Sequence, residues 1–361
     1  MIAALHSIVS RARPVEVAAP ALADFQLGAG EAIDARLANQ PGWSLYCLDL
    51  DARQAVFVEL APDVDLADAA FCGVRQFREA RRALVAPLTA LPGLAQDVAL
   101  PETLIFIFSM GRCGTTLAHW MFNEVEGVWG LSEPGALEDL VQGRRRLAPD
   151  ELRALLQAAT RLCFRPPPSR RARAFVVKLR SQALFGAGEF AAAFPQARAI
   201  FMHRDAVGWA NSRHLTGQRL GGNFIATIES RKEFWRRMTA GASLDGLKPY
   251  CDVESEAAGA EEFNAALWAR HMAEYESLRA GGMEFLAVDY ETLVEDREAT
   301  ARAMLRHSGL PEGAAARALR AFEADSQQGT ALARAHAATP MDARQLARFA
   351  AALARGGSYT R

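Results

Sequence analysis

Residues 104–116, which read LIFIFSMGRCGTT, decide the fold of this chain of 361 residues. The first five residues are an uninterrupted apolar run, which is typical of a strand buried on both faces of a sheet. A glycine-bearing turn follows, and the next residues, LAHWMF, continue as a helix. A strand, a glycine turn and a helix N-terminus place backbone N–H groups and the helix dipole around an anion. The stretch therefore predicts a phosphate-binding loop (P-loop).

The pattern after this loop predicts a parallel sheet that is covered by helices. Three more apolar runs have the character of buried strands: AFVVKLR (174–180), ARAIFMHR (197–204) and MEFLAVDY (283–290). Helical segments separate the runs, and such alternation is typical of a three-layer α/β fold with crossover connections. We predict this domain over residues 100–310, followed by a helical extension over 311–361.

Residues 1–95 have a different pattern and predict a small N-terminal accessory domain, made of a hairpin and a helix. The runs WSLYCLDL (43–50) and QAVFVEL (54–60) predict two strands, and the turn-prone DAR joins them as a hairpin. We expect a helix over Val74–Val85, with Pro87 as its stop. Between Thr216 and Ala260 the periodicity weakens, which fits a cover over the site or a surface insertion equally well.

Composition excludes several classes of protein. A formal net charge of −1 gives no overall attraction to nucleic acid or anionic membranes, so any anion site must be built locally. No apolar stretch approaches the roughly 18 residues that a membrane helix needs. The five cysteines form no CxxC pair and predict neither a disulfide framework nor a zinc site. We expect a cytoplasmic protein without a signal peptide or metal, and homo-oligomerisation is left open.

The loop differs from the P-loop of nucleotide triphosphatases. Their motif, GxxxxGK[ST], puts a lysine directly before the hydroxyl residue, whereas the cation here is Arg112, before the second glycine. The order cation-x-Gly-Thr-Thr resembles the 5′-phosphosulfate loop of cytosolic and bacterial sulfotransferases, many of which have lysine at this position. A ligand-free glycine turn is the alternative interpretation. The donor-binding residues that the resemblance implies in the loop are Gly111, Arg112, Cys113, Gly114, Thr115 and Thr116.

A second pair of residues distinguishes sulfotransferases from kinases. Arg204 ends a predicted strand, and Ser212 lies eight residues later in the next helix. Both can face a ligand at the carboxyl edge of a parallel sheet. In sulfotransferases the matching arginine and serine hold the 3′-phosphate of 3′-phosphoadenosine 5′-phosphosulfate, a group that kinase donors lack. Taken without the loop, the spacing favours a surface ion pair and a polar helix residue.

Two further segments resemble motifs that carry the chemistry of the family. LSEP (131–134) resembles the SEP motif of several sulfotransferase branches and makes Glu133 a candidate general base, although such a sequence also starts helices. FVVKLR (175–180) resembles the strand that carries KTH in many cytosolic sulfotransferases, and Lys178 matches its lysine. Arg180 stands where the usual catalytic histidine would be, so we expect it to bind a substrate anion or the bridging oxygen. The catalytic residues that the resemblance implies are Glu133, Arg112 and Lys178.

The matched motifs run in the order of the family from Leu104 to Leu293, where VDYETL (288–293) resembles a strand end of structural role. They imply transfer of a sulfonate group from 3′-phosphoadenosine 5′-phosphosulfate to a hydroxyl or amine of a small-molecule acceptor. The second product is 3′-phosphoadenosine 5′-phosphate. One alternative is an atypical P-loop kinase. The other is a nucleotide-binding protein without sulfonate transfer, and the absence of the usual histidine at position 180 favours this second alternative.

The acceptor is not readable from these motifs. Four aromatic residues are candidates for lining its pocket, although packing in the core is the more usual role of such residues. They are Trp209, Phe224, Phe234 and Trp235.

Overall fold

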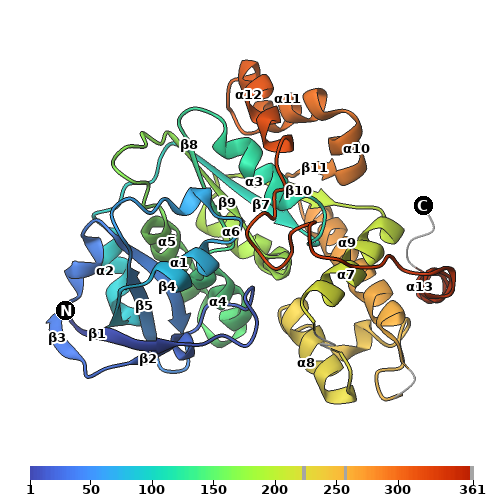
Figure 1. Ribbon diagram of the computed structural model, residues 1–361, viewed down its shortest axis with the longest axis horizontal. Helices are drawn as coiled ribbons and strands as arrows, with labels where there is room; N and C mark the ends of the chain where they lie inside the picture. Colours follow the sequence, from blue (N-terminus) through green and yellow to red (C-terminus); the bar gives the residue numbers. More distant parts are fainter. Residues whose placement is uncertain (222–224, 256–257, 358–361) are drawn as a thin grey trace.

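The apolar run from Leu104 forms the central strand of a parallel sheet, as predicted. The computed structural model describes residues 1–221, 225–255 and 258–357 (Figure 1). Within them the sheet has five strands in the order β11-β10-β7-β9-β8, all parallel. Four were predicted, and the fifth, β8, was missed because it is short and interrupted by a glycine. The strands are β7 (Thr103–Ser109), β8 (Val128–Ser132), β9 (Ala174–Lys178), β10 (Arg198–His203) and β11 (Leu286–Asp289).

Alternate residues of β7 enter two large hydrophobic cores, which is why its sequence shows no polar face. Phe106 and Phe108 pack in a core with α5 (Pro149–Cys163) and α6 (Ala187–Ala193). Ile105 and Ile107 pack on the other face, with residues of α3 (Thr115–Asn123) and α9 (Ala260–Ala280). The three-layer α/β architecture is therefore confirmed.

The N-terminal region contains more strands than the predicted hairpin. The hairpin is confirmed as β4 (Trp43–Asp49) and β5 (Gln54–Glu59), which pair antiparallel. The helix predicted over Val74–Val85 is wrong in its second half: α1 (Cys72–Glu79) ends early, and Arg82–Pro87 forms β6. β6 lies between β5 and β1 (Ile2–Arg11), so pairing with distant strands decides its conformation. β2 (Phe25–Leu27) and β3 (Glu31–Asp34) both pair with β1 and complete a six-stranded sheet among the described residues.

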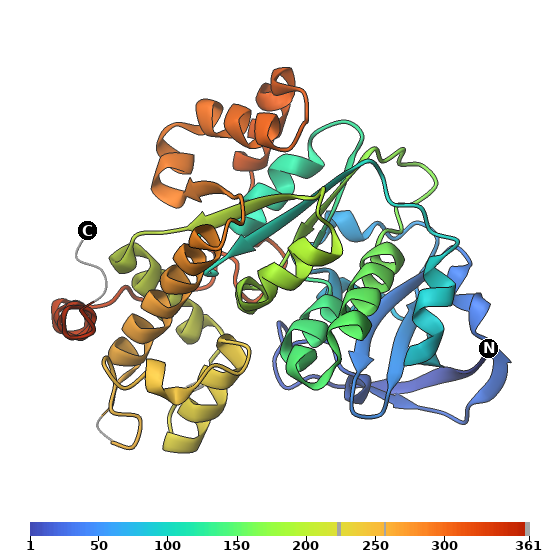
Figure 2. The same cartoon turned by 180° about the vertical axis from the view of Figure 1, so that it is seen from behind.

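The N-terminal sheet shares one core with the central sheet. This core continues from the N-terminal strands through α2 (Leu91–Ala95), α4 (Gly135–Gly143) and α5 to β7 and β9. Figure 2 shows the blue N-terminal sheet beside the green helices that connect it to the central sheet. The boundary between residues 95 and 100 stays a prediction, since apolar packing crosses it.

The remaining helices surround the carboxyl edge of the central sheet and one of its sides. The region 216–260, where periodicity was weak, includes α8, while Phe224 lies outside the described residues. No described helix is long and apolar enough to cross a membrane. The helices at the carboxyl edge and the side of the central sheet are α7 (Ala206–Arg219), α8 (Ile228–Met238), α10 (Tyr290–Glu295), α11 (Arg297–His307), α12 (Ala315–Ala318) and α13 (Ala343–Arg355).

Candidate active site

The loop after β7 turns through the left-handed region of backbone conformation. Gly111 and Gly114 have φ values of +75° and +80°, which glycine adopts without penalty. Arg112 has a φ of +56°, a conformation that costs energy for a residue with a Cβ and persists where its surroundings enforce it. Gly114 is the N-cap of α3, so the turn leads directly into the amino end of this helix. The predicted anion cradle is therefore built by backbone as well as by side chains.

The side chains of the loop differ in what they offer to a ligand. Cys113 is fully buried, and its Sγ donates to the carbonyl oxygen of Met202 at 3.1 Å. The side chain of this cysteine therefore belongs to the core behind the loop. The hydroxyl of Thr116 accepts a hydrogen bond from Nε2 of Gln327 at 2.9 Å, and its own O–H can still donate to an anionic ligand.

Arg112 connects the loop with α7. Its Nε donates to Oγ of Ser212 at 3.3 Å, so the serine that we grouped with Arg204 contacts the arginine of the loop. Burial lowers the pKa of Arg112, and the positive charge of Arg219 lowers it further. The loop and α7 thus bring positive charge together at the carboxyl edge of the sheet.

Arg204, at the end of β10, is fixed by the segment that follows β11. Its Nε lies 3.0 Å from Oε1 of Glu291, and its guanidinium carbon lies 4.2 Å from the centre of the Tyr290 ring. A Cβ on Gly114 would come within 2.7 Å of the same ring, so Tyr290 packs directly against the loop. The structural role expected for VDYETL is to set the position of Arg204 and of the loop together.

Glu133 and Lys178 form a buried ion pair at the ends of β8 and β9. The side chain of Lys178 is only 4% exposed, and that of Glu133 is 15% exposed. Glu133 has a φ of +58°, and its backbone N–H donates to the carbonyl oxygen of Lys178 at 2.7 Å. The two candidate catalytic residues therefore lie next to each other and neutralise each other.

Arg180 extends the ion pair into a network of four charges. Its Nε lies 3.0 Å from Oε2 of Glu133 and 2.9 Å from Oε2 of Glu138. Its terminal nitrogen also donates to the carbonyl oxygens of Val17 and Ala18, at 3.0 and 3.3 Å. Protein acceptors thus surround the Arg180 guanidinium, and its binding of a substrate anion or of the bridging oxygen stays a prediction.

The network sets the charge state of its members. Burial would raise the pKa of Glu133, but the charges of Lys178 and Arg180 outweigh this effect and hold the pKa below its ordinary value. Burial lowers the pKa of Lys178, although Glu133 opposes this shift. Burial raises the pKa of Glu138, which has a weaker cationic environment. Its lowered pKa keeps Glu133 ionised at neutral pH, the form in which a carboxylate can accept a proton.

The aromatic candidates for the acceptor pocket belong mainly to the core. Trp209 and Trp235 are fully buried, and Nε1 of Trp209 donates to the carbonyl oxygen of Gly111 at 2.8 Å. Trp209 therefore supports the loop from behind and does not line a pocket. Phe234 is half-buried, with the guanidinium of Arg237 at 5.0 Å from its ring centre. It stays a candidate.

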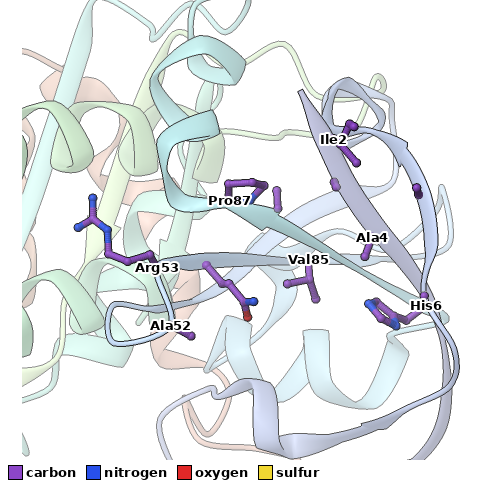
Figure 3. Close-up of a pocket in the computed structure, with 12 residues that line it drawn as sticks. Ile2, Ala4, His6, Ala52, Arg53, Val85 and Pro87 are labelled. Atoms are coloured by element: carbon purple, nitrogen blue, oxygen red, sulfur yellow. The ribbon is translucent and has the colours of Figure 1, made fainter.

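A hollow of about 550 Å³ lies elsewhere, on the N-terminal sheet. Figure 3 shows Ile2, Ala4, His6, Val85 and Pro87 around it, from β1 and β6. None of the residues that line it belongs to the loop or to the charged network, so it is not the active site.

Several residues of the site were not predicted. Arg219 lies seven residues after Ser212, or two helical turns, so its spacing was the available signal. Glu138, Gln327 and the N-terminal segment reach the site through tertiary contacts for which the sequence offers no local pattern. Among the described ranges, no group of three or more His, Cys, Asp or Glu side chains is arranged to hold a metal ion.

Comparison with known proteins supports the interpretation of these motifs. The profile of the sulfotransferase family matches residues 104–248. This range contains the loop, Glu133, Lys178, Arg204 and Ser212. A search of curated proteins finds no match.

Solved structures similar to the chain include sulfotransferases of low sequence identity. One is a sulfotransferase from Alicyclobacillus acidocaldarius, with 15% identity, a TM-score of 0.36, and coverage of 72% of this chain and 94% of that one. Another is the sulfotransferase domain of the olefin synthase of Synechococcus PCC 7002, with 16% identity, a TM-score of 0.33, and coverage of 72% of this chain and 96% of that one. A third is retinol dehydratase in complex with androsterone and the inactive cofactor PAP, with 13% identity, a TM-score of 0.36, and coverage of 72% of this chain and 82% of that one. On this match, residues 104–248 of the chain are similar to the sulfotransferase family.

Proposed function

We propose that this sulfotransferase takes its sulfonate group from 3′-phosphoadenosine 5′-phosphosulfate and transfers it to a hydroxyl or amine of a small-molecule acceptor. The observation that supports this donor is the contact between Arg112 of the loop and Ser212 of α7, beside the strand end that holds Arg204. The loop suits the 5′-phosphosulfate, and Arg204 with Ser212 suits the 3′-phosphate. ATP carries no 3′-phosphate and would leave this second part of the site without a ligand.

In the proposed reaction, the acceptor oxygen or nitrogen attacks sulfur in line with the bond to the bridging oxygen. That bond breaks, its electron pair stays on the 5′-phosphate, and the acceptor proton moves to Glu133. Arg112, Lys178 and the backbone N–H groups of the loop neutralise the charge on the leaving oxygen. Positioning and charge stabilisation contribute most of the rate enhancement, by analogy with phosphoryl transfer.

Lys178 must leave Glu133 to reach the leaving oxygen, and this movement serves both residues. It brings a cation to the oxygen that gains negative charge. It also frees Oε1 of Glu133, the atom that Lys178 contacts, to accept the acceptor proton. Arg180 stays on Oε2 and keeps the carboxylate in place. Arginine and lysine supply the positive charge, so we propose that the reaction needs no metal.

The state of the cysteines supports a proposal on the cellular compartment of the protein. All five are free and buried, including Cys47 and Cys251 at the two ends of the series. Free thiols persist in a reducing compartment, which supports a cytoplasmic location.

The donor is tested by calorimetric titration of the chain, without metal, with 3′-phosphoadenosine 5′-phosphate, with 5′-AMP and with ATP. We expect the bisphosphate to bind most tightly. Arg204→Ala should weaken its binding by roughly 10- to 100-fold, the loss of a charged hydrogen bond, and should leave 5′-AMP unaffected. Arg302→Ala is the matched control, because Arg302 lies in an exposed pair with Glu298.

Two results would contradict the proposal. The first is tighter binding of ATP with Mg²⁺ than of the bisphosphate, which would favour the atypical kinase. The second is equal binding of 5′-AMP and the bisphosphate, since the 3′-phosphate would then contribute nothing. Binding of the bisphosphate without turnover of the donor would favour the nucleotide-binding protein.

A further inference from the structure

A segment without helix or strand crosses the site between α12 and α13. We name residues 325–339 the strap; Figure 1 shows it in dark orange and red. Nε2 of Gln327 donates to the hydroxyl of Thr116 at 2.9 Å, and Nε1 of Trp120 donates to the carbonyl oxygen of Ser326 at 3.0 Å. The strap therefore lies on α3, directly beside the loop that we assign to the donor.

Arg219 of α7 is held by the same strap. Its Nε donates to the carbonyl oxygen of His336 at 3.2 Å, and Nη1 approaches that of Leu332 at 3.4 Å. Arg219 follows Ser212 by two turns, so both face the same side of α7. Because Ser212 contacts Arg112, Arg219 lies on the side of α7 that faces the loop, and its charge lowers the pKa of Arg112.

Glu133 acts on the positive charge of Arg112 from beyond ion-pair distance. Among the residues that the structure describes, no carboxylate lies within ion-pair distance of Arg112 or Arg219. Two neighbouring cations without a carboxylate between them form a favourable place for an anion. In this structure, Arg219 contacts neutral carbonyl oxygens of the strap.

The N-terminal region holds the strap in this position. Oε2 of Glu16 accepts a hydrogen bond from the backbone N–H of Ala331 at 2.7 Å, and Glu16 also pairs with Arg78. Leu332 packs with Phe71 in a small apolar cluster. The closed arrangement is nevertheless incomplete, because Oε1 of Gln327 is buried and has no hydrogen-bond partner in the described part of the chain. A buried acceptor without a partner is unfavourable, so the strap gains by moving away when a ligand takes its place.

We propose that Arg219 is a further binding residue for an anionic group of the donor, and that the strap, which contacts Arg219 in this structure, gives way when the donor binds. This inference rests on the proposed function, because it assumes an anionic donor at the loop. Phosphate oxygens would replace the carbonyls of Leu332 and His336, and a charged acceptor binds a guanidinium more strongly than a neutral one.

The competing explanation is that Arg219 only anchors the strap, and the two explanations predict effects of opposite sign. The probe is 3′-phosphoadenosine 5′-phosphate, titrated calorimetrically into the full chain. Gln327→Ala removes one neutral hydrogen bond of the strap and should tighten binding by about three- to tenfold. Arg219→Ala also loosens the strap, yet it should weaken binding by at least about tenfold, because a charged contact to the ligand is lost.

Gln218→Ala is the matched control on the same helix. Gln218 holds the strap through the N–H and carbonyl groups of Thr339 but carries no charge, so its loss should tighten binding or leave it unchanged. Arg219→Gln is a second variant, which can still donate to the strap carbonyls without the charge. It should weaken binding as Arg219→Ala does. A thermal melt of each variant identifies any that fail to fold.

Two results would overturn the inference. If Arg219→Ala and Arg219→Gln tighten binding or leave it unchanged, Arg219 is only an anchor. If Gln327→Ala weakens binding, the strap supports the donor site and does not compete with it. Failure of the donor assignment is visible separately, as equal affinity of the unsubstituted chain for the bisphosphate and for 5′-AMP.

Discussion

Replacing Lys178 with methionine should destabilise the chain by about 3 kcal/mol. Lys178 and Glu133 are 4% and 15% exposed, so the substitution leaves a buried carboxylate that has lost one of its two cations. Breaking a buried ion pair from one side costs about 3–5 kcal/mol. We expect the lower end of this range because Arg180 still lies 3.0 Å from Glu133.

The assay is urea denaturation of a double-mutant cycle. Lys178→Met leaves two carboxylates and one arginine in the network, and Glu133→Gln leaves two cations and one carboxylate. The double variant leaves Arg180 with Glu138, which balance each other at 2.9 Å. The double variant should therefore be more stable than the sum of the single losses predicts, by about 1–3 kcal/mol. Arg302→Met is the control, since its pair with Glu298 is 45% and 61% exposed and should contribute less than about 1 kcal/mol.

Catalysis should respond differently from stability in the same cycle. Glu133→Gln should lower kcat by about 10²- to 10⁴-fold through loss of the base, and Lys178→Met should lower it by about 10²- to 10³-fold. The double variant should regain stability without regaining kcat, because neither chemical group is restored. The reasoning fails if Lys178→Met costs no more stability than Arg302→Met, or if Glu133→Gln keeps the kcat of the unsubstituted chain.

Three further predictions follow from the site. In the pH profile of kcat/KM, the midpoint of the acid limb should lie below 4.5, the ordinary pKa of a glutamate. Activity falls as Glu133 is protonated, and the cationic neighbours of Glu133 lower its pKa. The alkaline limb should lie below 10.5, because Lys178 acts as a cation and burial lowers its pKa; a limb that survives in Lys178→Met would assign it to another group. Gly114→Ala combines a φ of +80° with a Cβ 2.7 Å from the ring of Tyr290, and should destabilise by about 1–3 kcal/mol in thermal denaturation, whereas Gly188→Ala, with open space around its Cβ, should not destabilise. Activity should persist in excess chelator, and a complete loss that Mg²⁺ restores would contradict the metal-free mechanism.

The fold was predictable where strands are buried on both faces. The apolar runs of β7, β9 and β10 are continuous because each face of the sheet has its own core. Most strands of the N-terminal sheet were not predicted, because their conformation depends on pairing with strands that are distant in the sequence. β1 gains its partners from residues 31–34 and 82–87, and neither its own sequence nor that of β6 indicates a strand without them. Pairing across such distances is decided by packing, which local sequence patterns do not record.

The residues that we propose for the donor site could be placed in the fold from the sequence, because the loop, Arg204 and Ser212 each lie at a fixed distance from a strand end. Their side-chain contacts could not be predicted. The sequence could not show that Ser212 contacts Arg112, since the rotamers of both side chains depend on the packing of α7 against the loop. The hydrogen bond between Gln327 and Thr116 joins residues more than 200 positions apart and could not be predicted from the sequence either.

The contacts of Arg180 connect the N-terminal region to the proposed active site. Although burial opposes its charge, Glu138 and Glu133 raise the pKa of Arg180 above its ordinary value, so this residue cannot accept the acceptor proton. A permanent cation there is tolerated because two carboxylates and the carbonyl oxygens of Val17 and Ala18 surround it. Introducing the usual histidine would therefore leave these acceptors without their cation and would not restore the usual base. The identity of residue 180, the position of Glu133 and the path of the first twenty residues form one arrangement, in which none can change alone.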